Sequence, residues 1–239
     1  MAETTIHTAA REMPAYVATP TAPGSWPGVV VIHDAFGMTP VMRKHADWLA
    51  GEGFLAAAPT LFRSGGMISC MRAAFRDIVA GHGPTFDDIE ATRAWLTAQP
   101  GCSRKIGVIG FCMGGGFALV LAPGRGFSAS SANYGRLPKD AEKVLEGACP
   151  IVGSYGATDR SLRGAAGQLE KILSDKGIPH DIKEYPGAGH SFLDDHAPGD
   201  VPRLMLVLMK MFGAGYNEPA AVDARKRIVA FFGTHLRVA

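Results

Sequence analysis

The sequence lacks any apolar run long enough to cross a membrane. A spanning helix needs about 20 consecutive apolar residues, whereas the longest candidate, Leu204–Phe212, is much shorter and contains Lys210. The N-terminus also lacks the apolar segment of a secretory signal. We therefore expect no membrane association and a cytoplasmic location.

An excess of charge of one sign is also missing. The 24 Lys and Arg residues nearly balance the 22 Asp and Glu residues, which leaves a net charge of +2. Since no basic stripe stands out, the sequence argues against a nucleic-acid partner and leaves a small molecule as the expected one.

Cysteine is scarce, and no C-x-x-C pair occurs. The four residues Cys70, Cys102, Cys112 and Cys149 therefore indicate neither a disulfide framework nor a structural zinc site. Their sparse, unpaired distribution suits a reducing compartment, in agreement with the expected cytoplasmic location.

Short apolar strands alternate along the chain with amphipathic helices. Strands are predicted at Ala15–Ala18, Val29–Ile32, Phe54–Ala58, Ile106–Ile109, Ser128–Tyr134, Pro150–Tyr155 and Asp181–Tyr185. Helices are predicted at Pro40–Glu52, Met67–Val79, Phe86–Gln99, Gly115–Leu121, Leu162–Leu173, Val201–Phe212 and Ala220–Leu236. This alternation predicts an α/β fold with a mostly parallel central sheet flanked by helices.

The 239 residues suffice for one α/β domain with a sizeable core, and no linker divides them. We expect a single domain over residues 1–239, with edge strands in 1–27. The Met-rich segment 196–216 has three alternative roles, as a lid, a dimer contact or part of the core, of which the core is favoured.

The motif that organises the chain is Gly110-Phe111-Cys112-Met113-Gly114, between the strand Ile106–Ile109 and the apolar helix Gly115–Leu121. This is the strand–turn–helix context of a nucleophile elbow, with cysteine in the serine position. The glycines allow the tight turn, and the helix N-terminus favours a thiolate. The alternative is a cysteine that serves only as a small buried apolar residue.

Two partners follow Cys112 in the chain order of an α/β hydrolase, nucleophile, acid and histidine. Asp159 follows a predicted strand, and His190 lies in a Gly-rich loop after the next strand. Taken singly, Asp159 has the alternative role of a helix N-cap, and a lone histidine is usually a surface residue. Together, in this order and at strand ends, they predict a Cys-His-Asp triad.

Rival residues exist for two of these roles. Asp181 and Asp194 are alternative acids, but one lies inside a strand and the other follows the histidine. His33 is an alternative base, although a packed pocket histidine is the favoured interpretation.

An oxyanion needs two backbone N–H donors. The expected donors are Met113, directly after the nucleophile, and Ala35 in the loop after Val29–Ile32. An ordinary strand-to-helix connection is the alternative interpretation of that loop.

These motifs resemble the dienelactone hydrolase family, a cysteine-nucleophile branch of the α/β hydrolases. The matching pieces are Ile32–Gly37, Gly53–Leu61, Ile106–Gly115, Tyr155–Asp159 and Gly187–Phe192. The resemblance implies the α/β-hydrolase fold and the same three catalytic roles for Cys112, His190 and Asp159. It also implies hydrolysis of a lactone or small ester without a metal or organic cofactor.

The chain departs from this family at two positions. Well-known members carry a glutamate that activates the cysteine where this sequence has Asp34, and an arginine that grips a substrate carboxylate where it has Leu193-Asp194-Asp195. An aspartate there would repel an anionic lactone. Arg63, Arg72 and Arg76 are candidate replacements, although solvated surface residues are the favoured interpretation.

The loop residues His33, Asp34 and Phe36 are candidates for lining the pocket or activating the nucleophile. We therefore expect a carboxylic ester or lactone hydrolase, acting through a thioester as a monomer or homodimer. The alternatives are an inactive ligand-binding protein on the same scaffold and a cysteine-based redox or acyl-transfer protein, although no resolving cysteine lies near Cys112.

Overall fold

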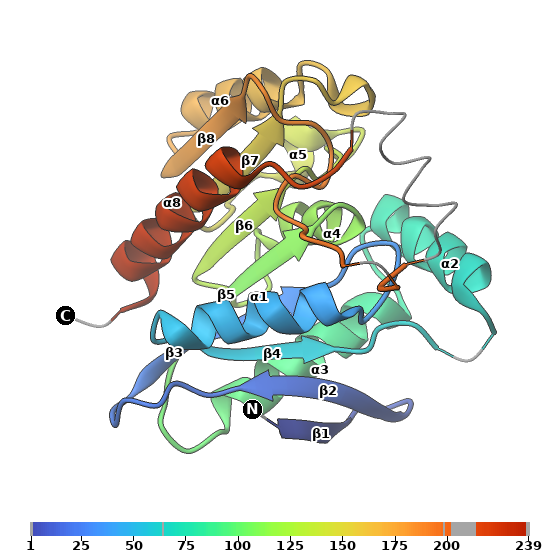
Figure 1. Cartoon of the computed structure of the whole chain (residues 1–239), viewed down its shortest axis with the longest axis vertical. Helices are drawn as coiled ribbons and strands as arrows, with labels where there is room; N and C mark the ends of the chain where they lie inside the picture. Colours follow the sequence, from blue (N-terminus) through green and yellow to red (C-terminus); the bar gives the residue numbers. More distant parts are fainter. Residues whose placement is uncertain (1, 64, 198, 202–213, 238–239) are drawn as a thin grey trace.

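Eight strands form one sheet in the order β1-β2-β4-β3-β5-β6-β7-β8 (Figure 1). The computed structural model describes residues 2–63, 65–197, 199–201 and 214–237. The strands are β1 (Ala2–His7), β2 (Glu12–Ala18), β3 (Trp26–Ile32), β4 (Leu55–Pro59), β5 (Cys102–Phe111), β6 (Ala129–Asn133), β7 (Ile151–Gly156) and β8 (His180–Tyr185). The pairings from β4 to β8 are all parallel, whereas β1 and β2 pair antiparallel at one side of the sheet.

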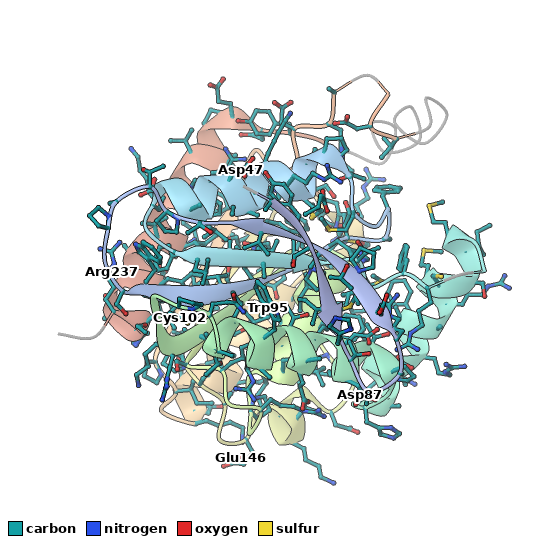
Figure 2. The ribbon with its side chains drawn as sticks, turned by 90° about the horizontal axis from the view of Figure 1, so that it is seen from below. Asp47, Asp87, Trp95, Cys102, Glu146 and Arg237 are labelled. Atoms are coloured by element: carbon teal, nitrogen blue, oxygen red, sulfur yellow. The ribbon has the colours of Figure 1, made fainter. Side chains whose placement is uncertain are left out.

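Helices cover both faces of this sheet. They are α1 (Pro40–Gly51), α2 (Met67–Ala80), α3 (Pro84–Thr97), α4 (Met113–Leu121), α5 (Ala141–Val144), α6 (Ala165–Asp175) and α8 (Glu218–Leu236), with a 3-10 turn η1 at Arg160–Leu162. Figure 2 places Asp47 of α1 and Trp95 of α3 on opposite sides of the strands. Among the described residues, no helix has the length and apolar character of a membrane span.

The core lies in two layers, one on each face of the sheet. On one face, Leu49 of α1 and Phe232 of α8 pack in a single buried cluster. On the other, Leu96 of α3 and Phe117 of α4 pack in another. Both faces of the central strands are therefore buried, which explains why β3 reads as the continuous run Val29–Ile32 rather than as an alternating strand.

The observed fold confirms the predicted single-domain α/β architecture with a mostly parallel sheet. The strand β1 falls in the segment 1–27, where edge strands were expected without bounds, whereas the four-residue helix α5 and the turn η1 were not predicted. The helix predicted from Leu162 begins at Ala165, because Asp159 caps the separate turn η1 first. Apart from Val201, the predicted helix Val201–Phe212 lies outside the described residues, as does most of the segment 196–216.

The first turn of α4 packs against the backbone at the end of β3. A Cβ atom built on Gly114 would lie 2.3 Å from the carbonyl oxygen of Ile32, a distance that real Cβ atoms essentially never show. Only glycine permits this approach. It brings the loop after β3 beside the turn after β5, at the carboxyl edge where open α/β sheets place their sites.

We expect Gly114→Ala to lower the free energy of unfolding by about 2–3 kcal/mol or to prevent folding, because rigid backbone cannot yield to the added methyl group. Gly233→Ala in α8 is the matched control, since nothing lies within 4 Å of its added Cβ, and it should gain about 0.5–1 kcal/mol. Urea denaturation followed by circular dichroism measures both changes. Equal losses in the two variants would contradict the close approach.

Candidate functional site

Cys112 sits at a sharp bend between β5 and α4. Its backbone has φ 54° and ψ −112°, a conformation that non-glycine residues rarely adopt. Its amide donates to the carbonyl oxygen of Asn133 at 3.0 Å, and its carbonyl accepts from the amide of Gly116 at 3.2 Å. The side chain is half-buried and directly precedes the N-terminus of α4, where the helix dipole favours negative charge.

The loop that carries His190 is bound to the loop that carries Asp159. Both the amide and the hydroxyl of Thr158 donate to the carbonyl oxygen of Ala188, at 3.0 and 2.8 Å. As a result, the Nδ1 atom of His190 lies 2.6 Å from Oδ2 of Asp159. The predicted base and acid, 31 residues apart in the chain, are thus brought together.

Asp159 divides its two carboxylate oxygens between two tasks. Oδ1 accepts from the amide and the hydroxyl of Ser161, at 2.9 and 2.6 Å, and so caps η1. Oδ2 accepts from His190. Asp159 is therefore both the N-cap of η1 and the hydrogen-bond partner of His190.

The Cys112 thiol lies near enough to the ring of His190 to raise its pKa, although the described hydrogen bonds of that ring include only the one to Asp159. Burial alone would lower the pKa of His190, but the hydrogen bonds and charges of Asp159 and Cys112 outweigh burial and raise it to about 10. Burial would likewise raise the pKa of Asp159, yet the bonds from His190 and Ser161 hold it below its usual value. The arrangement therefore favours a protonated imidazole beside the Asp159 carboxylate.

Residues with strained backbone conformations cluster at the carboxyl edge of the sheet. Four non-glycine residues have positive φ among the described residues, and three of them are Cys112, Tyr134 and Ser191, with φ of 54°, 41° and 58°. Tyr134 directly follows β6, and the centroid of its ring lies 5.2 Å from that of the His190 ring. Ser191 directly follows His190 in the chain. Strained conformations of this kind often accompany functional sites.

The loop after β3 supplies several of the predicted residues. Oδ1 of Asp34 accepts from the amide of Phe36 at 2.8 Å, which folds the loop back on itself. His33 uses both ring nitrogens in the scaffold, Nδ1 donating to the carbonyl of Asp34 at 2.7 Å and Nε2 accepting from the amide of Leu61 at 3.3 Å. Burial lowers the pKa of His33 to about 4, so its ring stays neutral.

A second buried network, which the sequence did not predict, lies beside these residues. The carboxylate of Asp194 accepts from Nε2 of His45 at 2.9 Å and from the hydroxyl of Tyr134 at 2.8 Å. Burial lowers the pKa of His45, so the neutral ring donates this bond. The sequence singles out Asp194 only as a rival acid and as a departure from a family pattern, and neither His45 nor Tyr134 carries a local motif.

Asp34 and His196 lie next to this network. Burial and the charge of Asp194 raise the pKa of Asp34 to about 8, against the opposing hydrogen bond from Phe36. The Nε2 atom of His196 lies 4.0 Å from Oδ2 of Asp34, and its ring meets that of Phe36 edge to face at 6.0 Å. Among the described hydrogen bonds, Asp34 makes none to Cys112.

The family model described as the dienelactone hydrolase family matches residues 13–236. The chain belongs to this family. A carboxymethylenebutenolidase of Rhodococcus opacus is 29% identical over 241 residues, covering 90% of this chain and 84% of that protein. A crystal structure from Klebsiella pneumoniae, named "putative dienelactone hydrolase", superposes with a TM-score of 0.79 at 26% identity over 97% of both chains.

The fold is shared more widely than the sequence. The dienelactone hydrolase-like promiscuous phosphotriesterase P91, from metagenomic libraries, superposes with a TM-score of 0.77 at 21% identity, covering 99% of this chain and 98% of that one. The chain is accordingly a dienelactone hydrolase-like hydrolase with the α/β-hydrolase fold.

The arginines considered as replacements for the expected carboxylate-binding group lie elsewhere in this dienelactone hydrolase family member. Arg63 donates to Asp88 at 3.0 Å, and Arg76 lies 3.7 Å from Asp77. Arg72 is exposed on α2. None of the three has a described hydrogen bond or ion pair with the residues around Cys112.

We expect Asp159→Asn to lower the pKa of the His190 imidazole by about 1–3 units, because the variant removes an adjacent negative charge. Asp195→Asn, at an exposed carboxyl close in sequence, should leave it unchanged. Heteronuclear NMR of the histidine side chains during a pH titration gives both values.

The same shift fixes the sign of the pH dependence of stability. The native pKa of His190, about 10, exceeds the unperturbed value of 6.5. The pair therefore stabilises the fold fully below pH 6.5, and its contribution is lost as the pH rises toward 10. A native His190 that titrates near 6.5 in the unsubstituted protein would contradict the ion pair.

Proposed function

We propose that this protein hydrolyses carboxylic esters or lactones by nucleophilic catalysis at Cys112. The observation that carries the proposal is the 2.6 Å contact between Nδ1 of His190 and Oδ2 of Asp159, in a ring whose pKa the nearby Cys112 thiol also raises. A nucleophile with a base in reach, and the base oriented by a third group, is the arrangement that covalent catalysis requires. Family membership supports the same class of reaction.

In the first step, the Cys112 thiolate attacks the substrate carbonyl carbon while His190 holds the proton. The C–S bond forms as the carbonyl π electrons move to oxygen. The tetrahedral intermediate then expels the alkoxide, which takes the proton from His190. A thioester on Cys112, an alcohol and a neutral imidazole result; with a lactone, the alcohol stays attached to the acyl group.

The developing oxyanion needs donors aimed at its position. We assign the amide of Met113, because the first N–H of a helix has no partner within the helix and Met113 is the first residue of α4. The second is the amide of Ala35, in the loop that the Gly114 contact brings alongside. Neither amide donates a loop hydrogen bond among the described residues.

In the second step, the neutral His190 ring removes a proton from a water molecule that attacks the thioester. Collapse of the second tetrahedral intermediate breaks the C–S bond, releases the acid and restores the thiolate–imidazolium pair. Side chains, backbone amides and water supply every group in this scheme.

All four cysteines are free, which supports the expected reducing, cytoplasmic location.

We expect Cys112→Ala and His190→Ala each to lower kcat/KM for a short p-nitrophenyl ester by at least about a thousandfold. The double variant should be no slower than either single one, because removing one member of a catalytic unit already removes the contribution of the other. Cys70→Ser is the matched control, because Cys70 only donates to the carbonyl of Arg63. Full activity in Cys112→Ala would overturn the proposal; no activity in the unsubstituted protein on any ester or lactone would favour a ligand-binding protein.

We further propose that the site prefers neutral substrates to anionic ones, because Asp194 occupies the place where an arginine was expected. Unit charges about 5 Å apart repel by about 3 kcal/mol at an effective dielectric constant of 20. We therefore expect p-nitrophenyl butyrate to exceed p-nitrophenyl hemisuccinate at least about tenfold in kcat/KM at low salt.

This preference should shrink at high salt and in Asp194→Asn, whereas Asp195→Asn, which alters an exposed carboxyl, should preserve it. Steady-state kinetics with the two esters measures the ratio in each variant, and thermal melts verify that the variants fold. Equal or faster turnover of the hemisuccinate would contradict the assignment.

A further inference from the structure

Three side chains that the proposed reaction does not use converge beside the site. Asp34, Asp194 and His196 each offer one ligand atom, and these atoms all lie within 4.8 Å of one another. Asp34 comes from the loop after β3, whereas Asp194 and His196 follow the His190 loop. The fold thus joins two segments that are 160 positions apart in the chain, from 34 to 194.

Two of these side chains are buried with polar atoms that have no partner. The side chains of Asp34 and His196 are only 2% and 4% exposed. Oδ2 of Asp34 and both ring nitrogens of His196 lack a hydrogen-bond partner among the described residues. Each such group costs about 1–3 kcal/mol, and native proteins rarely leave buried polar atoms without a water or an ion. The cluster therefore offers buried, unpartnered polar atoms of the kind that bind an ion or a water molecule.

The third side chain is already held in place. The bonds from His45 and Tyr134 fix the carboxylate of Asp194 in one orientation, one on each oxygen. Each carboxylate oxygen keeps a second lone pair available for a ligand. Supporting hydrogen bonds of this kind orient the ligands in known metal sites.

We propose that Asp34, Asp194 and His196 bind one divalent transition-metal ion of the Zn²⁺ type. Two carboxylates concentrate negative charge, and an imidazole among them favours zinc, cobalt or nickel over magnesium and calcium, which prefer oxygen alone. Three protein ligands with a further open position are a common zinc coordination.

The donor atoms are close enough to converge on one ion. Tetrahedral zinc bonds of about 2.0–2.2 Å to nitrogen and oxygen place two donor atoms roughly 3.4 Å apart. Nε2 of His196 and Oδ2 of Asp34 lie 4.0 Å apart, and no two ligand atoms are more than 4.8 Å apart, so the side chains must close on the ion by about 0.5–1.5 Å. The proposal departs from the sequence-based expectation of a metal-free protein, and no step of the proposed hydrolysis depends on it. The preference for neutral esters applies to the metal-free protein, because a bound cation would offset the charge of Asp194.

The test measures metal binding directly and does not depend on turnover. Isothermal titration with Zn²⁺, and visible absorption with Co²⁺, are recorded on metal-free Cys112→Ser protein, because a thiol would otherwise compete for the metal. We expect one equivalent to bind, with cobalt bands that lack a sulfur charge-transfer feature. Adding His196→Ala should weaken binding at least about tenfold, and Asp34→Asn should weaken it as well.

His7→Ala is the matched control, because the side chain of His7 is 77% exposed on β1, and it should bind as before. Thermal melts without metal establish that each variant folds; if His196→Ala does not fold, Asp34→Asn decides alone. Absence of stoichiometric binding in the Cys112→Ser protein would overturn the site. Undiminished affinity in the folded variants would overturn it too, and binding that requires Cys112 would assign the metal to the thiol instead.

Discussion

The close contact between the first turn of α4 and the end of β3 is the constraint on which the site depends. Gly114 lets the backbone of α4 reach the carbonyl oxygen of Ile32. This contact fixes the bend at Cys112 and sets the loop after β3 beside it. The amides proposed to hold the oxyanion, on Met113 and Ala35, belong to these two segments. A longer side chain at position 114 would separate them, so a backbone requirement determines the chemistry that the edge of the sheet can perform.

Asp159 links the local structure to the proposed base. One oxygen caps η1 through Ser161, and the other accepts from His190. The hydrogen bonds from Ser161 restrain the carboxylate independently of His190, so less side-chain freedom is lost when the pair between Asp159 and His190 forms. The bonds from Thr158 to Ala188 restrain the histidine loop in turn. The high pKa of His190 is thus a product of rigid placement as well as of opposite charge.

The sequence predicted the parts of the site that are encoded locally. A strand, a Gly-x-Cys-x-Gly turn and an apolar helix follow one another directly, and Asp159 and His190 each stand at the end of a predicted strand. It did not predict the bonds of Asp194 to His45 and Tyr134, which join residues 149 and 60 positions apart. Such contacts depend on how helices and loops pack over the sheet, and a single sequence carries no periodic signal of them. The segment 202–213 lies outside the described residues.

Asp194 also affects the neighbouring carboxyl group of Asp34. Burial and the charge of Asp194 raise the pKa of Asp34 to about 8, and a divalent cation at the proposed site would oppose this by favouring the ionised carboxylate. Asp194 itself is held in place by hydrogen bonds from His45 and Tyr134. In the proposed function, the aspartate at position 194 therefore acts twice: the site lacks the arginine that the family resemblance implies, and the charge of Asp194 raises the pKa of the neighbouring Asp34 carboxyl.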